Sequence, residues 1–256
     1  MKRVLAPLVF GFLLMGAWEL GVRLGDVPAY ILPGPAAIID ALWANLGELF
    51  SSLAVTLEVT LAALALAALS GGVIAILLAQ SELAERIVFP YAVFLQVTPI
   101  VTIAPFVIIW VENVFVVLLI LAWMAAIFPI ISNTLLGLKS VDANLKDLFR
   151  LYGATRAQTV RRLMIPSALP YFLGGLRIAG GLALIGTVVA EMVAGTSGTR
   201  SGLASRLVEA SYRLELAVAL ACFFLLSATG LVLYLALDAF SRRLLRHWHE
   251  SARTPA

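Results

Sequence analysis

Long apolar runs alternate with short polar segments along most of the chain. A helix that spans a bilayer needs about 20 mostly apolar residues. Six runs reach that length, roughly 4–22, 53–79, 88–110, 114–138, 171–194 and 214–240. The pattern predicts an all-α membrane protein, a polytopic bundle of six transmembrane helices that forms a single domain over residues 1–256.

Prolines interrupt two of these runs. Pro99 and Pro105 lie in the third run, and Pro129 lies in the fourth. Proline is tolerated inside a span where neighbouring helices satisfy the freed carbonyl groups. We therefore expect kinked helices that pack against one another.

One segment outside the predicted spans is amphipathic. Pro35 suits the first position of a helix, and Gly34 is acceptable as its cap. From Ile38 to Phe50, apolar residues recur at helical spacing while acidic and amide residues take the other side. We expect this helix at the membrane interface, either resting on lipid or on the bundle, or forming a rim that meets an external partner.

Composition agrees with a membrane location. The chain is 62% hydrophobic and only 13% charged, whereas about a quarter of the residues of a soluble domain are charged. The formal net charge of +3 is too small to indicate a nucleic-acid surface.

The first apolar run ends at Trp18–Glu19 without a small-x-small cleavage site, so we expect an uncleaved first span.

Basic residues fall on alternate connections between the predicted spans. One set occupies the N-terminus, the second and fourth connections and the C-terminus, and the positive-inside rule places these parts in the cytoplasm. Both termini are then cytoplasmic, which agrees with an even number of spans. The set is Lys2, Arg3, Arg86, Lys139, Lys146, Arg150, Arg156, Arg161, Arg162, Arg242, Arg243, Arg246 and Arg253.

The loop from 139 to 170 is polar, basic and on the predicted cytoplasmic side. Helical spacing predicts a short helix from Val141 to Tyr152, with apolar side chains along one face. Gly153 is well placed to end that helix in a left-handed conformation.

A second short helix is predicted to begin at Thr155. Gln158 lies three residues further on and completes a capping box. We expect Pro166 and Pro170 to stop this helix and to lead into the fifth span. Two short helices with an apolar stripe either dock onto a partner or rest on lipid headgroups, which the nearby basic residues would favour.

The loop resembles the signature loop of ABC importer permeases. That signature has an acidic residue and two alanines, a glycine after three further residues, and then an Ile-x-Leu-Pro segment. The matching frame here is Asp147-Leu148-Phe149, Gly153 and Leu163-Met164-Ile165-Pro166. Further segments are similar to the nitrate, sulfonate and taurine branch of the family, among them Leu32-Pro33-Gly34-Pro35, Phe128-Pro129-Ile130, Gly175-Leu176-Arg177 and Ala190-Glu191.

The resemblance implies a type I ABC importer permease fold with a cytoplasmic coupling helix, in a bacterial cytoplasmic (inner) membrane. Its implied partners are a cytoplasmic ABC ATPase dimer, a second permease copy or a paralogue, an extracytoplasmic substrate-binding protein and membrane lipid, with no nucleic acid. ATP and Mg would bind the partner ATPase, and no cofactor is expected on this chain. The residues implied to couple to the ATPase are Asp147, Leu148, Phe149, Gly153, Ala154, Thr155, Gln158 and Pro166.

The chain departs from the family pattern at one point. The two alanines of the signature are Leu148 and Phe149 here, and these bulkier side chains change the packing of the loop or the groove that faces it. The change is consistent with a dedicated ATPase, or with a heterodimer that contains a second, more typical permease.

Four polar residues inside the predicted spans are candidates for the pathway or a gate: Glu58, Asn133, Arg177 and Glu191. Ionisable groups in a membrane are expensive and face the bundle or a cavity. Each is either a structural lock or a residue whose polar end reaches the interface, or it lines the pathway or a gate. Arg177 and Glu191 are fourteen residues apart, about 21 Å along a helix, so they cannot pair with each other.

The sequence carries no signs of chemistry of its own. Cys222 is the only cysteine, and no Gly-x-x-x-x-Gly-Lys phosphate loop occurs, so we expect a transport subunit rather than an enzyme. The expected cargo is a small solute, either a nitrate-, sulfonate- or taurine-like anion or a pyrimidine or flavin precursor. The alternative is an ion-coupled secondary transporter, which would need an internal repeat that we do not find.

Overall fold

The computed structural model describes residues 2–195 and 201–246. All regular elements in these residues are helical, as the apolar pattern predicts. The chain divides into two compact units, one formed by 1–56 with 195–228 and the other by 57–194 with 229–256. The prediction of a single transmembrane domain is not tested by this division.

The first unit holds two complete N-terminal helices, a short helix near the chain's end, and parts of two long helices that continue into the second unit. The elements are α1 (Lys2–Leu24), α2 (Pro35–Ala44), the beginning of α3 (Leu46–Leu78), α10 (Leu203–Tyr212) and the beginning of α11 (Leu216–Leu245).

The helix α2 is shorter than the sequence pattern predicts. It ends at Ala44, and the side-chain amide of Asn45 donates a hydrogen bond of 2.8 Å to the carbonyl oxygen of Ala41. Asparagine competes with the helical backbone in this way, which favours a helix end. The amphipathic residues beyond Asn45 belong to α3, so the prediction of one helix from Ile38 to Phe50 is wrong.

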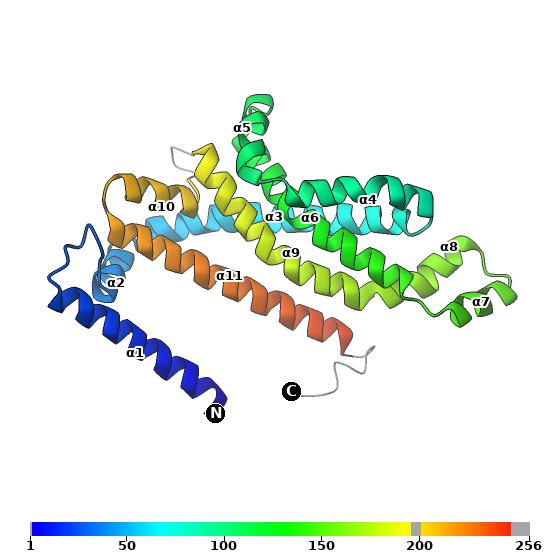
Figure 1. Ribbon diagram of the computed structural model, residues 1–256, viewed down its shortest axis with the longest axis horizontal. Helices are drawn as coiled ribbons and strands as arrows, with labels where there is room; N and C mark the ends of the chain where they lie inside the picture. Colours follow the sequence, from blue (N-terminus) through cyan, green and yellow to red (C-terminus); the bar gives the residue numbers. More distant parts are fainter. Residues whose placement is uncertain (1, 196–200, 247–256) are drawn as a thin grey trace. The chain divides into compact units, whose positions relative to one another are not determined.

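The second unit holds the remaining elements (Figure 1). They are α4 (Glu82–Val97), α5 (Ile100–Trp110), α6 (Val114–Lys139), α7 (Ala143–Leu151), α8 (Arg156–Thr159), a π-helical turn η1 (Val160–Met164) and α9 (Ile165–Ala194), with the remainders of α3 and α11. The helix α6 agrees closely with the predicted fourth span, because Asn113 caps it by accepting a hydrogen bond from the backbone N–H of Val116.

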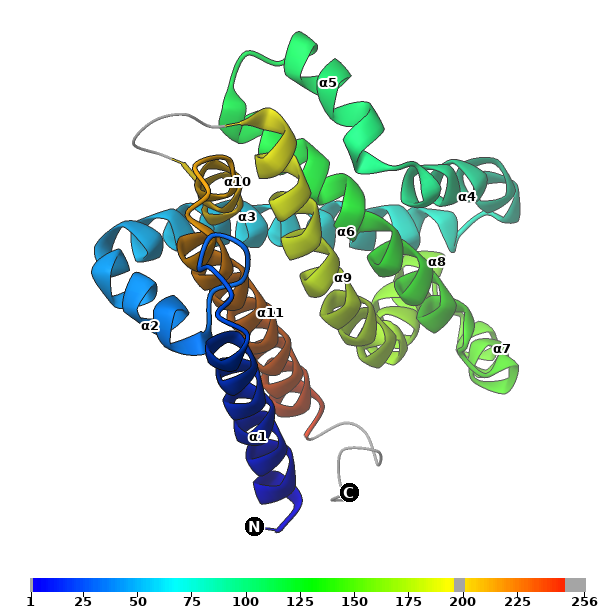
Figure 2. The same cartoon turned by 60° about the vertical axis from the view of Figure 1, so that its left-hand side comes forward.

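The core of this unit is the pair α6 and α9, which lie side by side in both views (Figures 1 and 2). Small residues permit the close approach. A Cβ atom placed on Gly175 would lie 2.7 Å from the carbonyl oxygen of Pro129, and one on Gly137 would lie 2.7 Å from Cβ of Tyr171. Such small-residue contacts are typical of helix pairs in membranes, where packing rather than hydrophobic burial drives association.

The predicted third span is not one kinked helix. The chain bends by 99° between α4 and α5. Pro99 has no N–H to continue the hydrogen bonds of α4, and its ring forces the preceding residue, Thr98, into an extended conformation with ψ 123°. Pro105 lies inside α5 without ending it. The predicted interruption at Pro99 is therefore confirmed, but it breaks the segment from 88 to 110 into two helices instead of kinking one, and Pro105 does not interrupt α5.

Four helical stretches in the described residues are long and apolar enough to cross a membrane: α3, α6, the continuous run Arg156–Ala194, and α11. The bent pair α4 and α5 makes a fifth if it counts as one span. The helix α1 covers the predicted first span but is not among these candidates. The number six therefore stays a prediction.

Candidate functional site

The loop between α6 and α9 folds into a short helical hairpin, α7 followed by α8. Asp142 begins α7, because its carboxylate accepts a hydrogen bond of 2.8 Å from the backbone N–H of Asn144. At the root of the hairpin, the ammonium group of Lys139 forms an ion pair with Glu85, which ties the end of α6 to α4.

Gly153 ends α7 in the left-handed conformation that the sequence predicts, with φ +67°. Its N–H donates to the carbonyl oxygen of Arg150 at 2.9 Å, and the N–H of Ala154 donates to that of Phe149 at 2.9 Å. These two bonds are the Schellman arrangement. No atom lies within 4 Å of a Cβ placed on Gly153, so backbone conformation alone, and not crowding, selects glycine here.

The predicted capping box is confirmed. The hydroxyl of Thr155 accepts from the N–H of Gln158 at 3.3 Å, and the side chain of Gln158 accepts from the N–H of Thr155 at 2.8 Å. The prediction that Pro166 and Pro170 stop this helix is wrong. The helix continues through η1 into α9. In η1 the N–H of Ile165 bonds to Val160, so the wider turn shifts the hydrogen-bond register before Pro166, which has no N–H to give.

The hairpin carries exposed apolar side chains and an excess of basic ones. Leu151 and Tyr152 are each 84% exposed, and Leu145 and Leu148 are nearly half exposed, whereas Phe149 is half-buried. Asp147 lies 3.9 Å from Arg150, a loose surface ion pair. Large apolar groups exposed outside the apolar spans mark a contact surface.

The four polar residues predicted for the pathway come from different helices, and one of them forms an ion pair. Arg177 on α9 forms an ion pair with Asp238 on α11, with 2.9 Å between Nη2 and Oδ1. The other carboxylate oxygen of Asp238 pairs with Arg242. Arg177 is therefore already engaged by a carboxylate of its own unit, which is the geometry of a lock between two helices.

The remaining three candidates lie elsewhere. The side-chain amide of Asn133 on α6 donates a hydrogen bond of 2.8 Å to the carbonyl oxygen of Pro129. Asn133 lies next to Gly175 of α9. Glu58 is exposed on α3. Glu191 is fully buried on α9, and one turn before it Thr187 accepts a hydrogen bond of 3.1 Å from Thr60 on α3. The four residues are thus distributed over three helices, α3, α6 and α9.

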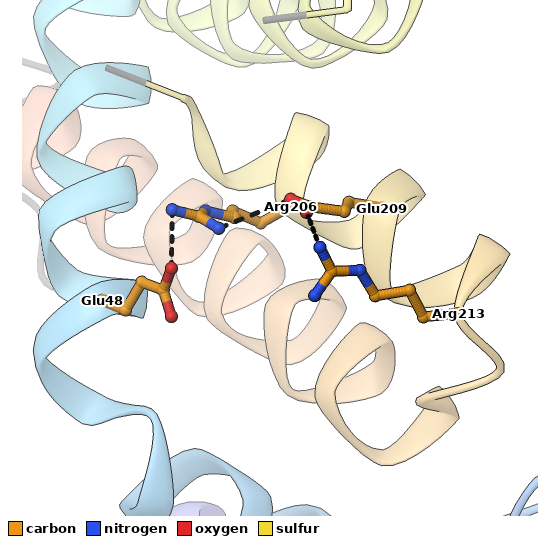
Figure 3. A network of polar contacts seen from close by, with 4 residues as sticks. All are labelled: Glu48, Arg206, Glu209 and Arg213. Atoms are coloured by element: carbon orange, nitrogen blue, oxygen red, sulfur yellow. Dashed lines mark hydrogen bonds and ion pairs between the residues drawn. The ribbon is translucent and has the colours of Figure 1, made fainter. Parts of the chain in front are cut away.

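A second polar network lies in the first unit (Figure 3). Arg206 on α10 lies 2.6 Å from Glu48 at the beginning of α3 and 3.4 Å from Glu209, which in turn lies 2.7 Å from Arg213. The hydroxyl of Thr56 also accepts a buried hydrogen bond of 2.8 Å from the N–H of Leu203. Together these contacts hold α10 on the first turns of α3.

Sequence reasoning missed Asp238 and Glu48. A carboxylate four residues before Arg242 in an apolar run is a visible signal for Asp238. Its partner Arg177 is far away in the chain, however, and no pattern joins the two. Among the described residues, no group of three or more His, Cys, Asp or Glu side chains is placed to hold a metal ion.

A family model described as "Binding-protein-dependent transport system inner membrane component" matches residues 69–246. The chain belongs to this family. The match contains the hairpin, the α6–α9 pair and both residues of the Arg177–Asp238 lock. The protein is therefore an ABC transporter permease, and the resemblance drawn from the signature loop is confirmed.

Named relatives agree with this family. The formylaminopyrimidine transport permease protein of Halalkalibacterium halodurans is 36% identical over 203 residues, which cover 77% of this chain and 80% of the relative. The riboflavin transport system permease protein of Chloroflexus aurantiacus is 31% identical over 241 residues, covering 93% and 88%.

A solved structure shares the fold. The crystal structure of an amino acid ABC transporter matches with a TM-score of 0.64 at 16% identity, over 80% of this chain and 96% of that one. At 16% identity, this structural similarity supports a shared fold and nothing more. It confirms the predicted fold class, an all-α helical bundle of the kind found in that transporter.

Proposed function

We propose that this permease works with a separate pair of cytoplasmic ATPase subunits, which engage the α7–α8 hairpin. The observation that carries the proposal is the hairpin itself, a rigidly capped element with exposed apolar side chains at the end of the α6–α9 pair (Figures 1 and 2). Capping at Asp142, Gly153 and Thr155 gives it a fixed shape, which a lever between two proteins requires.

The continuous helix from Arg156 to Ala194 connects the hairpin to a predicted membrane span, so a movement of the hairpin can be transmitted to the bundle. In the proposed cycle ATP closes the ATPase pair, the hairpin moves with it, and α9 carries that motion to the bundle, which opens outward. The change is a two-state switch whose balance is set by nucleotide. An extracytoplasmic binding protein then delivers the solute to the open side, and a second permease copy or a paralogue completes the pathway.

The proposed cargo is a small solute, either a sulfonate-, nitrate- or taurine-like anion or a pyrimidine or flavin precursor. The relatives named for formylaminopyrimidine and riboflavin transport support the heterocyclic class, and those named for aliphatic sulfonates transport support the anionic class. Arg177 is the one arginine within the predicted fifth span, and its guanidinium is already paired with the carboxylate of Asp238.

The proposed orientation has both termini and the hairpin in the cytoplasm. The basic residues of α7, α8 and η1 and those at the end of α11 support it through the positive-inside rule. The proposed function is tested by uptake into membrane vesicles, which is expected to follow ATP rather than an ion gradient. Uptake that follows the ion gradient instead would refute it.

A further inference from the structure

The hairpin contains a pocket of about 450 Å³ at the corner where α7 turns into α8. Its lining comes from both helices and the turn between them: Leu148, Phe149, Tyr152, Gly153, Ala154, Gln158 and Arg162. The two bulky residues that stand where the permease family carries alanines, Leu148 and Phe149, form part of its apolar wall. The departure from the family pattern therefore lies at this pocket.

One cation in the lining has no partner within the described part of the chain. Arg162 is exposed, and no carboxylate of the described residues forms an ion pair with it. The surrounding surface is basic, since Lys146, Arg150, Arg156, Arg161 and Arg162 outnumber the acidic Asp142 and Asp147. A partner surface that meets this pocket needs negative charge near Arg162 and an apolar group for the wall.

We propose that this pocket is a socket that receives an apolar side chain of the ATPase subunit, with a carboxylate of the same subunit paired to Arg162. The inference rests on the proposed function and names the chemistry of the partner's contact. In this arrangement the hairpin offers the ATPase a cavity as well as exposed side chains.

The pocket's form favours a protein side chain over two other occupants. Sites for small molecules bury most of their ligand, whereas this pocket is open and two residues of its lining, Tyr152 and Leu148, are themselves exposed. Lipid headgroups would be attracted by all the basic side chains alike and would leave the apolar wall uncovered. An open pocket with an apolar wall on one part of its lining and an arginine without an ion pair on another resembles a protein interface, in which apolar anchors are surrounded by polar contacts.

The test compares two adjacent arginines in the permease purified with the ATPase that accompanies it. Arg162 lines the pocket, whereas Arg161, which is also exposed and also has no ion pair among the described residues, does not. We expect R162E to weaken ATPase binding about tenfold or more, in the range of a close charge pair at an interface. We expect R161E to change it less than about threefold, as a charge outside the contact would. Ala154→Leu, which fills the pocket without a charge change, is expected to weaken binding as well.

Binding is measured in nanodiscs of zwitterionic lipid and again in discs with anionic lipid, with thermal unfolding as the check that each variant is folded. Equal losses for R162E and R161E, or a loss for R162E only in anionic discs, overturn the socket. Unchanged binding by Ala154→Leu also overturns it. If no ATPase accompanies even the unmodified permease, the proposed function itself fails, which is a different result.

Discussion

At Gly153 the backbone conformation of the hairpin bears directly on the proposed coupling of ATP hydrolysis to uptake. Its φ of +67° lies in the left-handed region, and nothing surrounds the position of a Cβ atom. A β-branched residue strains this region, whereas asparagine tolerates it. We expect Gly153→Val to reduce uptake several-fold while ATP hydrolysis continues, and Gly153→Asn to retain most uptake.

The measurement is uptake and substrate-stimulated ATP hydrolysis by the reconstituted transporter. Unchanged uptake and unchanged stimulation in Gly153→Val would show that the shape of this turn does not matter for coupling. Loss of both activities in the asparagine variant would point to a need for glycine that the backbone geometry does not explain.

Asp238 is the second residue with a sharp expectation, because it neutralises Arg177 between two helices. Asp238→Asn leaves the partly buried guanidinium without a charged partner, which costs about 1–3 kcal/mol of stability. The control is Arg242→Gln, which removes a largely exposed member of the same cluster and costs less than about 1 kcal/mol. Thermal unfolding in detergent measures both. Equal losses in the two variants would contradict the lock between α9 and α11.

Residues whose partners are nearby in the chain could be predicted from the sequence. Gly153, Thr155 and Gln158 satisfy backbone groups within a few positions, so their spacing alone was sufficient. Arg177 and Asp238 meet only after α9 and α11 have packed, and no local rule joins them. For the same reason the polar pathway candidates were identified as residues but not as a site.

At the scale of elements, the prolines show that the sequence pattern does not decide whether a helix breaks or continues. Pro99 separates α4 from α5, whereas Pro166 lies in a helix that continues. The difference lies in what precedes each residue: Thr98 is extended, while the π turn η1 shifts the register before Pro166. Both outcomes depend on hydrogen bonds that the sequence does not display, so helix existence was predictable and helix continuity was not.

The α6–α9 pair provides a matched test of close packing. A Cβ on Gly175 would meet the carbonyl oxygen of Pro129 at 2.7 Å and Cβ of Asn133 at 3.0 Å, whereas one on the adjacent Gly174 meets no atom within 4 Å. We expect Gly175→Ala to destabilise the protein by about 1–3 kcal/mol through overpacking. We expect Gly174→Ala to be neutral or to stabilise it by about 0.5–1 kcal/mol through helix propensity.

Thermal unfolding of the two purified variants is the measurement. The paired design removes effects of helix propensity and of detergent, because both substitutions are identical and adjacent on α9. A Gly175→Ala variant as stable as Gly174→Ala would show that the approach of α6 to α9 is looser than the structure describes.

At the scale of the whole molecule, the permease combines a bundle of apolar helices with the α7–α8 hairpin. Apolar content and charge asymmetry predict the bundle and its orientation from the sequence. The energy source for transport cannot be predicted from the composition of this chain in the same way, because in the proposed function it lies in separate ATPase subunits. The central claim is therefore that transport through this permease is driven by ATP.

The most direct test is uptake by membrane vesicles that contain the complete transporter, with its binding protein and cargo supplied. We predict uptake that disappears when ATP is depleted and that persists when an uncoupler collapses the ion gradient. A Gly153→Val transporter serves as the matched control, because its ATP hydrolysis is expected to continue while its uptake falls several-fold. Uptake that survives ATP depletion and disappears with the uncoupler would contradict the ATP-driven mechanism and would establish an ion-coupled transporter instead.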